Sequence, residues 1–98
     1  MVKITYVFNE DAIRQAGTSR DELLKNIRNF VAHRDGAEEP EYGVFTLDKD
    51  ENDLELMITA KKELRNSSSF RRMFKFVYCD VDGEKSDCIN TIENFKVY

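Results

Sequence analysis

Residues 19–34 read SRDELLKNIRNFVAHR, and this stretch decides the fold because it carries the local signals of an amphipathic helix. Ser19 and, three residues later, Glu22 form a capping box, in which each side chain accepts a hydrogen bond from the other residue's amide. Gly36 follows the last turn as a stop signal, so the sequence predicts a helix over 19–34. Its apolar residues recur at helical spacing and form one stripe: Leu23, Leu24, Ile27, Phe30 and Val31.

The residues before this helix predict a strand and a short helical turn. From Val2 to Asn9, strongly apolar side chains occupy every second position, which is the period of a strand with one buried face. The Asn9 side chain can cap the segment that follows, and Gly17 can close it. We therefore expect a short helical turn over Glu10–Ala16.

Beyond the main helix, the pattern predicts four further strands. Residues 37–43 read AEEPEYG and are expected to form an acidic loop, while residues 49–52 are expected to form the tip of a hairpin. Residues 61–69 are ambiguous, because AKKELRN favours a helical turn and NSSS favours a mobile loop. The four predicted strands are Val44–Asp48, Leu54–Ala60, Phe70–Asp80 and Lys85–Tyr98.

These elements predict a single α+β domain over residues 1–98. Short links between the later strands require antiparallel pairing, and one amphipathic helix can cover one face of the resulting sheet. We expect two layers, with a mainly antiparallel sheet of about five strands packed against the helix at 19–34. The expected order is β-α-α-β-β-(α or loop)-β-β. If residues 61–66 are helical, a ferredoxin-like order with an extra strand becomes the alternative.

Charge is unevenly distributed along the chain. Residues 61–75, the basic segment, hold six of the fifteen Lys and Arg side chains and a single acid. The segment therefore carries +5 while the rest of the chain carries −9, which gives the net charge of −4. A pI near 5.0 argues against a general affinity for nucleic acid or anionic membranes. Any binding of that kind is expected to be local to the basic segment.

Cys79 and Cys88 flank the turn Asp82-Gly83, and their relation depends on the length of that loop. A two-residue loop places Cys79 opposite Ser86, which leaves the two sulfurs in a diagonal relation that does not bridge easily. A four-residue loop would pair the cysteines directly. We favour free thiols, as is usual in the cytoplasm. The sequence shows neither a signal peptide nor a membrane span, so the predicted location is cytoplasmic.

Motifs for metal binding and catalysis are incomplete. Asp48–Asp53 begins like a calcium loop, but Asp53 stands where glycine is required and Thr59 where a bidentate glutamate is required. Asp80–Gly83 also resembles such a loop, although an Asp-Gly hairpin turn explains it without a metal. His33 is the only histidine, and its place at a helix C-terminus favours capping over catalysis. We therefore expect no enzyme activity, no cofactor and no metal.

Cations and aromatic rings interleave over Arg71–Tyr78. This pattern is typical of proteins that bind single-stranded nucleic acid, because charges meet phosphates and rings stack on bases. We favour a structural interpretation in which Phe74, Phe76 and Tyr78 face the helix as core and Lys75 points outward.

These observations favour a small, acidic, non-catalytic protein that binds another protein, as an inhibitor or decoy. Either the basic segment or the acidic loops at 35–41 and 48–55 could make the contact. The alternative is binding of single-stranded RNA through residues 61–78. No membrane partner is expected, and the sequence does not identify the protein partner. A homodimer that forms through an exposed sheet edge is a further alternative. The predicted partner-binding residues are Lys61, Lys62, Arg65, Arg71, Arg72, Glu38, Glu39, Glu41, Asp48, Asp50, Glu51 and Asp53.

Overall fold

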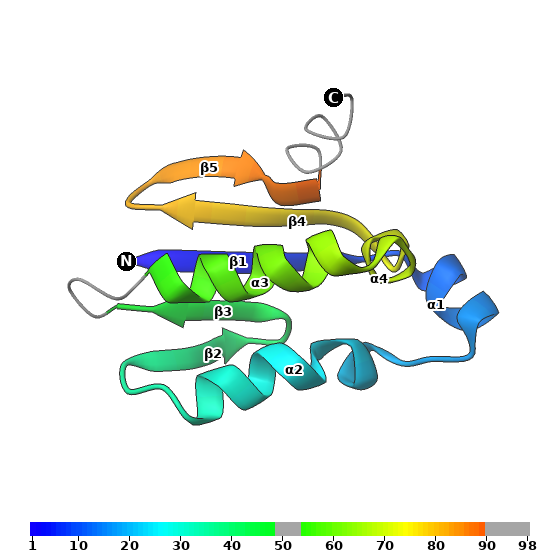
Figure 1. Cartoon of the computed structure of the whole chain (residues 1–98), viewed down its shortest axis with the longest axis horizontal. Coiled ribbons are helices and arrows are strands. Elements are labelled where there is room, and N and C mark those ends of the chain that lie inside the picture. The colour runs from blue at the N-terminus through cyan, green and yellow to red at the C-terminus, as the bar shows by residue number, and fades with distance from the viewer. Residues whose placement is uncertain (49–53, 90–98) are drawn as a thin grey trace.

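The computed structural model describes residues 1–48 and 54–89. Within these ranges the chain forms five strands and four helices (Figure 1). The first strand is followed by two helices, a hairpin, two more helices and a second hairpin. The elements are β1 (Val2–Phe8), α1 (Glu10–Ala16), α2 (Arg20–Ala32), β2 (Ala37–Glu41), β3 (Val44–Leu47), α3 (Leu54–Asn66), α4 (Ser68–Arg72), β4 (Phe74–Val81) and β5 (Glu84–Asp87).

The strands form one sheet in the order β2-β3-β1-β4-β5, and all neighbours in it are antiparallel. The predicted α+β class and the predicted order of helices and strands are confirmed. β1 lies in the middle, with one hairpin on each side. The chain order and the sheet order together give the ferredoxin-like arrangement with β5 as an extra strand, which was the alternative that required a helix at 61–66.

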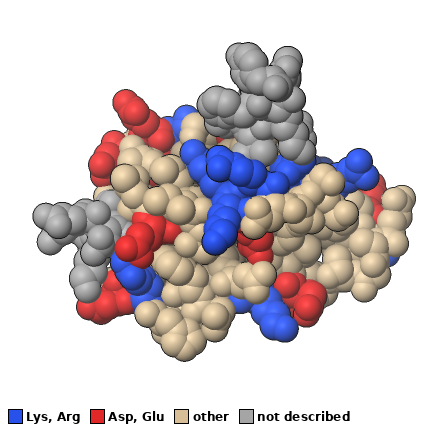
Figure 2. Space-filling view, viewed as in Figure 1, with Lys and Arg blue, Asp and Glu red and all other residues tan. Residues whose placement is uncertain are grey.

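Helices α2 and α3 lie side by side on one face of the sheet, α2 near β2 and α3 over β1 (Figure 1). Viewed from this side, Lys and Arg side chains gather over α3 (Figure 2). The opposite face, which we call the open face, is covered by neither of these two helices. The molecule therefore has two faces whose surroundings differ completely.

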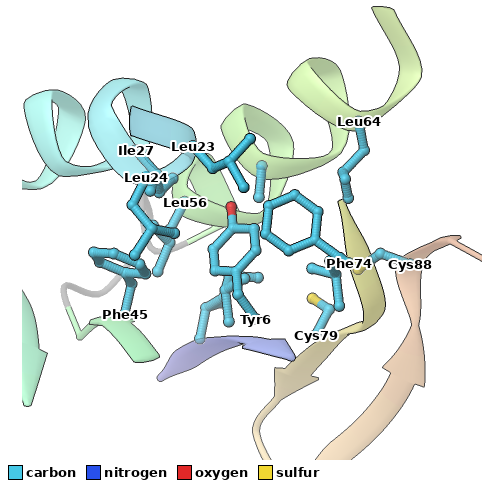
Figure 3. Packing of buried hydrophobic residues seen from close by; sticks show 14 of the residues in the cluster. Tyr6, Leu23, Leu24, Ile27, Phe45, Leu56, Leu64, Phe74, Cys79 and Cys88 are labelled. Carbon is cyan, nitrogen blue, oxygen red and sulfur yellow. The ribbon is translucent and has the colours of Figure 1, made fainter. Parts of the chain in front are cut away.

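The core lies between the sheet and these two helices (Figure 3). The predicted helix at 19–34 is confirmed: the Ser19 hydroxyl accepts a hydrogen bond from the amide of Glu22 at 3.2 Å, and α2 runs to Ala32. Asn9 caps α1 in the same way, and Gly17 closes it with a φ of 69°. The central buried side chains are Val2, Ile4 and Tyr6 of β1, Leu23, Leu24 and Ile27 of α2, and Leu56, Ala60 and Leu64 of α3.

The prediction of a strand over Leu54–Ala60 is wrong, because these residues form the first half of α3. Leu56, Ala60 and Leu64 recur every four residues and are fully buried, which is the helical period. Leu54 and Ile58, which a strand would bury beside Leu56, are 43% and 59% exposed. A short apolar run fits both periods, and here the helical period continues into the residues that the sequence left ambiguous.

Residues 37–43 do not form the expected loop. Ala37–Glu41 make the edge strand β2, and the register of its pairing with β3 shifts between Glu38 and Glu41. Pro40 lies inside this shift, at the edge of the sheet, where a residue without an amide hydrogen is tolerated. Residues 70–72 belong to α4, so the strand predicted from Phe70 begins at Phe74.

The hairpin β4–β5 confirms the predicted two-residue loop. Cys79 lies opposite Ser86. Asp82 and Gly83 have φ values of 51° and 93°, and a type I′ hairpin turn requires such positive φ values at both of its central residues. Cys79 and Cys88 are free and buried, as expected. β5 ends at Asp87, and the strand predicted over Lys85–Tyr98 is wrong at Cys88 and Ile89, which are helical. Its continuation over 90–98, like the predicted hairpin tip at 49–52, lies outside the described residues.

A β-bulge in β4 changes which rings are buried. Val7 lies opposite Phe76 and Phe8 opposite Phe74, so Lys75 is an extra residue without a partner on β1. Phe74 is buried as expected, but Phe76 and Tyr78 point to the open face. The expectation that all three rings form the core is therefore wrong for Phe76 and Tyr78, because the bulge reverses the alternation after Phe74.

The hydroxyl of Tyr6 supplies a test of the core. It is buried among apolar side chains and has no hydrogen-bond partner among the described residues, and burial raises the pKa of Tyr6 (Figure 3). Because an unsatisfied buried hydroxyl destabilises the folded state, Tyr6→Phe should raise the free energy of unfolding by about 1 kcal/mol in urea titrations.

Tyr42→Phe is the matched control. The Tyr42 hydroxyl donates a hydrogen bond to Asp21 at 2.6 Å at the surface, so its removal should lower the stability slightly. A loss of stability in Tyr6→Phe as large as that in Tyr42→Phe would mean that the buried hydroxyl has a partner.

Candidate functional site

The outward side of α3 carries a continuous stripe of exposed and partly exposed residues, which we call the α3 outer face. Two apolar residues begin the stripe and three cations continue it, at spacings that place all five on one side of a helix. A shallow hollow is lined by part of this stripe and by Asn66. The α3 outer face consists of Leu54, Ile58, Lys61, Lys62 and Arg65.

The cations of this region make no ion pair with any carboxylate in the described ranges. This holds for Lys61, Lys62 and Arg65 on α3 and for exposed Arg72 on α4. The arginines of the first half of the chain differ, because each of them is paired: Arg14 with Asp11, Arg20 with Glu10, Arg28 with Asp21 and Glu39, and Arg34 with Glu55. Among the described residues, no carboxylate therefore neutralises the positive charge of the α3 outer face by an ion pair.

Arg71 holds the fold together instead of facing a partner. Its side chain is 5% exposed, and its Nη1 donates hydrogen bonds to the carbonyl oxygens of Leu64 at 2.7 Å and Arg65 at 3.5 Å. These carbonyls belong to the last turn of α3, where a cation is favoured. Of the predicted basic residues, Lys61, Lys62, Arg65 and Arg72 thus lie on the surface, and Arg71 fastens α4 to α3.

The predicted acidic residues do not form one surface. Glu39 binds Arg28 through both carboxylate oxygens, at 3.0 and 3.1 Å, and accepts a hydrogen bond from the amide of Gly43. This contact joins α2 to the β2–β3 hairpin. Glu38 and Glu41 are exposed on β2, and Asp48 is exposed near the terminal ammonium group of Met1 at 3.9 Å. The remaining predicted acids, Asp50, Glu51 and Asp53, lie outside the described residues.

Aromatic side chains are exposed on the opposite side of the molecule. The rings of Phe76 and Tyr78 stack with their centroids 5.4 Å apart and their planes 11° from parallel. The ammonium nitrogen of Lys85 lies 4.1 Å from the centroid of Tyr78. These rings stand on the open face, so the sheet separates them from the cations of α3. Sequence reasoning missed this separation because the bulge at Lys75 has no local signature.

Few of the described groups suit catalysis. Within residues 1–48 and 54–89, no three His, Cys, Asp or Glu side chains are grouped so that they could hold a metal ion. His33 is exposed at the C-terminus of α2, with Nδ1 2.8 Å from the carbonyl oxygen of Asn29, as the capping interpretation predicts. Asp80 accepts a hydrogen bond from the amide of Gly83 at 2.8 Å, which explains the calcium-like Asp-Gly segment as a turn.

The two thiols form a small polar pair within the core. Their mutual hydrogen bond lowers the pKa of Cys79 and raises the pKa of Cys88, and burial opposes ionisation of both. The ammonium group of Lys61 lies close enough to favour the thiolate form of each. The α3 outer face therefore borders this pair through Lys61.

No protein-family model, curated protein or solved structure matches this chain. None of the helices in the described part of the chain has the length and apolar character needed to cross a membrane. A proposal for the function must therefore be argued from the surfaces of the described residues. Within residues 1–48 and 54–89, the α3 outer face is a surface on which several cations without an ion pair adjoin exposed aliphatic side chains.

Substitution of Arg71 tests its structural role. Arg71→Ala should lower the free energy of unfolding by about 2 kcal/mol, because it leaves buried carbonyls of α3 without their charged donor. Arg72→Ala, one residue away and exposed, should change stability by less than about 0.5 kcal/mol. Urea unfolding followed by circular dichroism compares the two variants, and equal effects would contradict the assignment.

Glu63 gives a pH-dependent test of the contact between α2 and α3. It is half-buried and accepts a hydrogen bond from Asn26 at 2.7 Å, and desolvation raises the pKa of its carboxyl group above the usual range. A raised pKa in the folded state means that the stability contributed by this group falls as the pH rises from its unfolded to its folded pKa. Glu63→Gln should therefore match wild type near pH 4 and exceed its unfolding free energy at pH 7. If Glu63→Gln exceeds the unfolding free energy of wild type by the same amount at both pH values, the raised pKa of Glu63 is contradicted.

Proposed function

We propose that this protein is a small non-catalytic binding module whose α3 outer face binds an acidic segment of another protein. The observation that carries the proposal is the group of unneutralised cations, Lys61, Lys62 and Arg65, next to exposed Leu54 and Ile58. A partner with carboxylates beside apolar side chains would be complementary to both parts of this face.

The position of the aromatic rings favours a protein partner over single-stranded nucleic acid. Binding of nucleic acid through residues 61–78 requires cations and rings on one surface. Here Phe76 and Tyr78 lie on the open face, and the apolar residues beside the α3 cations are aliphatic. The net charge of −4 also opposes the approach of a polyanion.

A module of this kind could act as an inhibitor, because it would cover an acidic segment that another basic ligand of the same partner needs. The free thiols Cys79 and Cys88 support a cytoplasmic location. The described sheet edges favour a monomer over a homodimer formed by strand pairing. One edge contains Pro40, and the other is the four-residue charged strand β5.

A charge-reversal pair tests the proposal. Lys62→Glu combined with Arg65→Glu should reduce capture of a protein partner from nuclease-treated native lysate by about ten-fold, because two attractive contacts become repulsive. Quantitative mass spectrometry of the captured proteins measures the loss, and the captured partner should have an acidic segment.

The control variant combines Lys25→Glu and Lys75→Glu, which changes the net charge equally at two other exposed cations. Capture should survive in this control. Equal losses in both double variants would make bulk charge the cause and contradict the proposal. Capture that disappears after nuclease treatment would support the nucleic-acid alternative instead.

A further inference from the structure

The open face has a definite composition, because strand pairing fixes which side chains share it. Lys3 lies between Thr46 and Asp80, and Thr5 lies between Val44 and Tyr78. The same pairing places Glu38 beside Thr46, Glu41 beside Val44, and Lys85 and Asp87 beside Asp80 and Tyr78. At the paired positions, four carboxylates therefore share this face with two ammonium groups. The open face is net acidic, in contrast to the α3 outer face.

An exposed aromatic stack stands on this acidic surface. Phe76 is 43% exposed, and its ring is stacked on Tyr78. Phe76 is the only large apolar side chain of the described strands β1 and β3–β5 with that much exposure. Aromatic faces carry partial negative charge, so they attract cations as well as apolar groups. Lys85 demonstrates this attraction, because its ammonium group already lies over the Tyr78 ring.

Charge decides which ligand suits this face. Single-stranded nucleic acid could stack on Phe76, but its phosphates would approach a surface with more carboxylates than ammonium groups. Guanidinium and ammonium groups are attracted both by the aromatic rings and by the carboxylates of this face, because both attract positive charge. We infer that the open face binds an extended, arginine- or lysine-rich segment of a protein. This surface is distinct from the α3 outer face and does not depend on the function proposed above.

The dimensions of β4 suit such a segment. Phe76, Tyr78 and Asp80 occupy alternate positions of β4 on the same face, so Phe76 and Asp80 are about 13 Å apart along the strand. An extended peptide running along β4 also repeats its side chains at every second residue. One cationic side chain can therefore lie on the Phe76 ring while another, four residues along, lies near Asp80.

The test uses fluorescence anisotropy with a labelled octa-arginine peptide at low salt. Phe76→Ala should weaken binding about five-fold by removing the exposed ring. Phe76→Tyr should retain binding because it keeps an aromatic face. Ile58→Ala removes a comparably exposed apolar side chain from the α3 outer face without a change of charge, and it should leave the affinity unchanged.

Amide chemical shifts locate the contact independently. Titration with octa-arginine should move the signals of Phe76, Tyr78 and Lys85 and leave those of Ile58 and Lys62 in place. Equal affinity of wild type and Phe76→Ala would overturn the inference, since acidity alone would then explain binding. Tighter binding of a ten-nucleotide oligothymidylate that depends on Phe76 would also overturn it, in favour of nucleic acid. Either result leaves the capture experiment on the α3 outer face unaffected.

Discussion

The burial of alternate side chains of β1 is the constraint on which the rest of the structure depends. Val2, Ile4 and Tyr6 lie beneath α2 and α3, and β1 is the central strand of the sheet. Because side chains of a strand alternate between faces, this burial assigns every paired residue on β3 and β4 to the covered or the open face. The two candidate surfaces therefore both follow from this core. The α3 outer face is the side of α3 that points away from the core, and the open face is the side of the sheet that points away from it.

Local signals were sufficient for the parts of the fold that depend on neighbouring residues. The Ser19 cap, the Asn9 cap and the Asp82-Gly83 turn each involve a few adjacent residues, and the structure agrees with all three. The prediction of a strand at residues 54–60 is wrong because a short apolar run fits two periods. The outward rings and the buried Arg71 depend on pairing with β1 and on packing of α4 against α3, which no local pattern reports.

The uneven charge of the sequence corresponds only partly to an uneven charge in space. Of the six cations in the basic segment, three lie on the α3 outer face, one is buried, one is exposed on α4 and one is the extra residue of the bulge. Four carboxylates of β2, β4 and β5 lie on the other side of the sheet: Glu38, Glu41, Asp80 and Asp87. The two proposed binding surfaces are therefore compatible, because a partner on one side of the sheet would not block the other side.

The extra residue in β4 has a consequence for how this chain can change. With Lys75 present, Phe74 seals the core and Phe76 reaches solvent, although the two are separated by a single residue. Loss of Lys75 would leave Phe74 and Phe76 adjacent on a regular strand, opposite Phe8 and Val7, so each ring would keep its face. Loss of Val77 would instead cancel the extra residue further along the strand and place Phe76 opposite Tyr6, on the covered face. The point at which this strand gains or loses a residue therefore determines which rings the exterior displays.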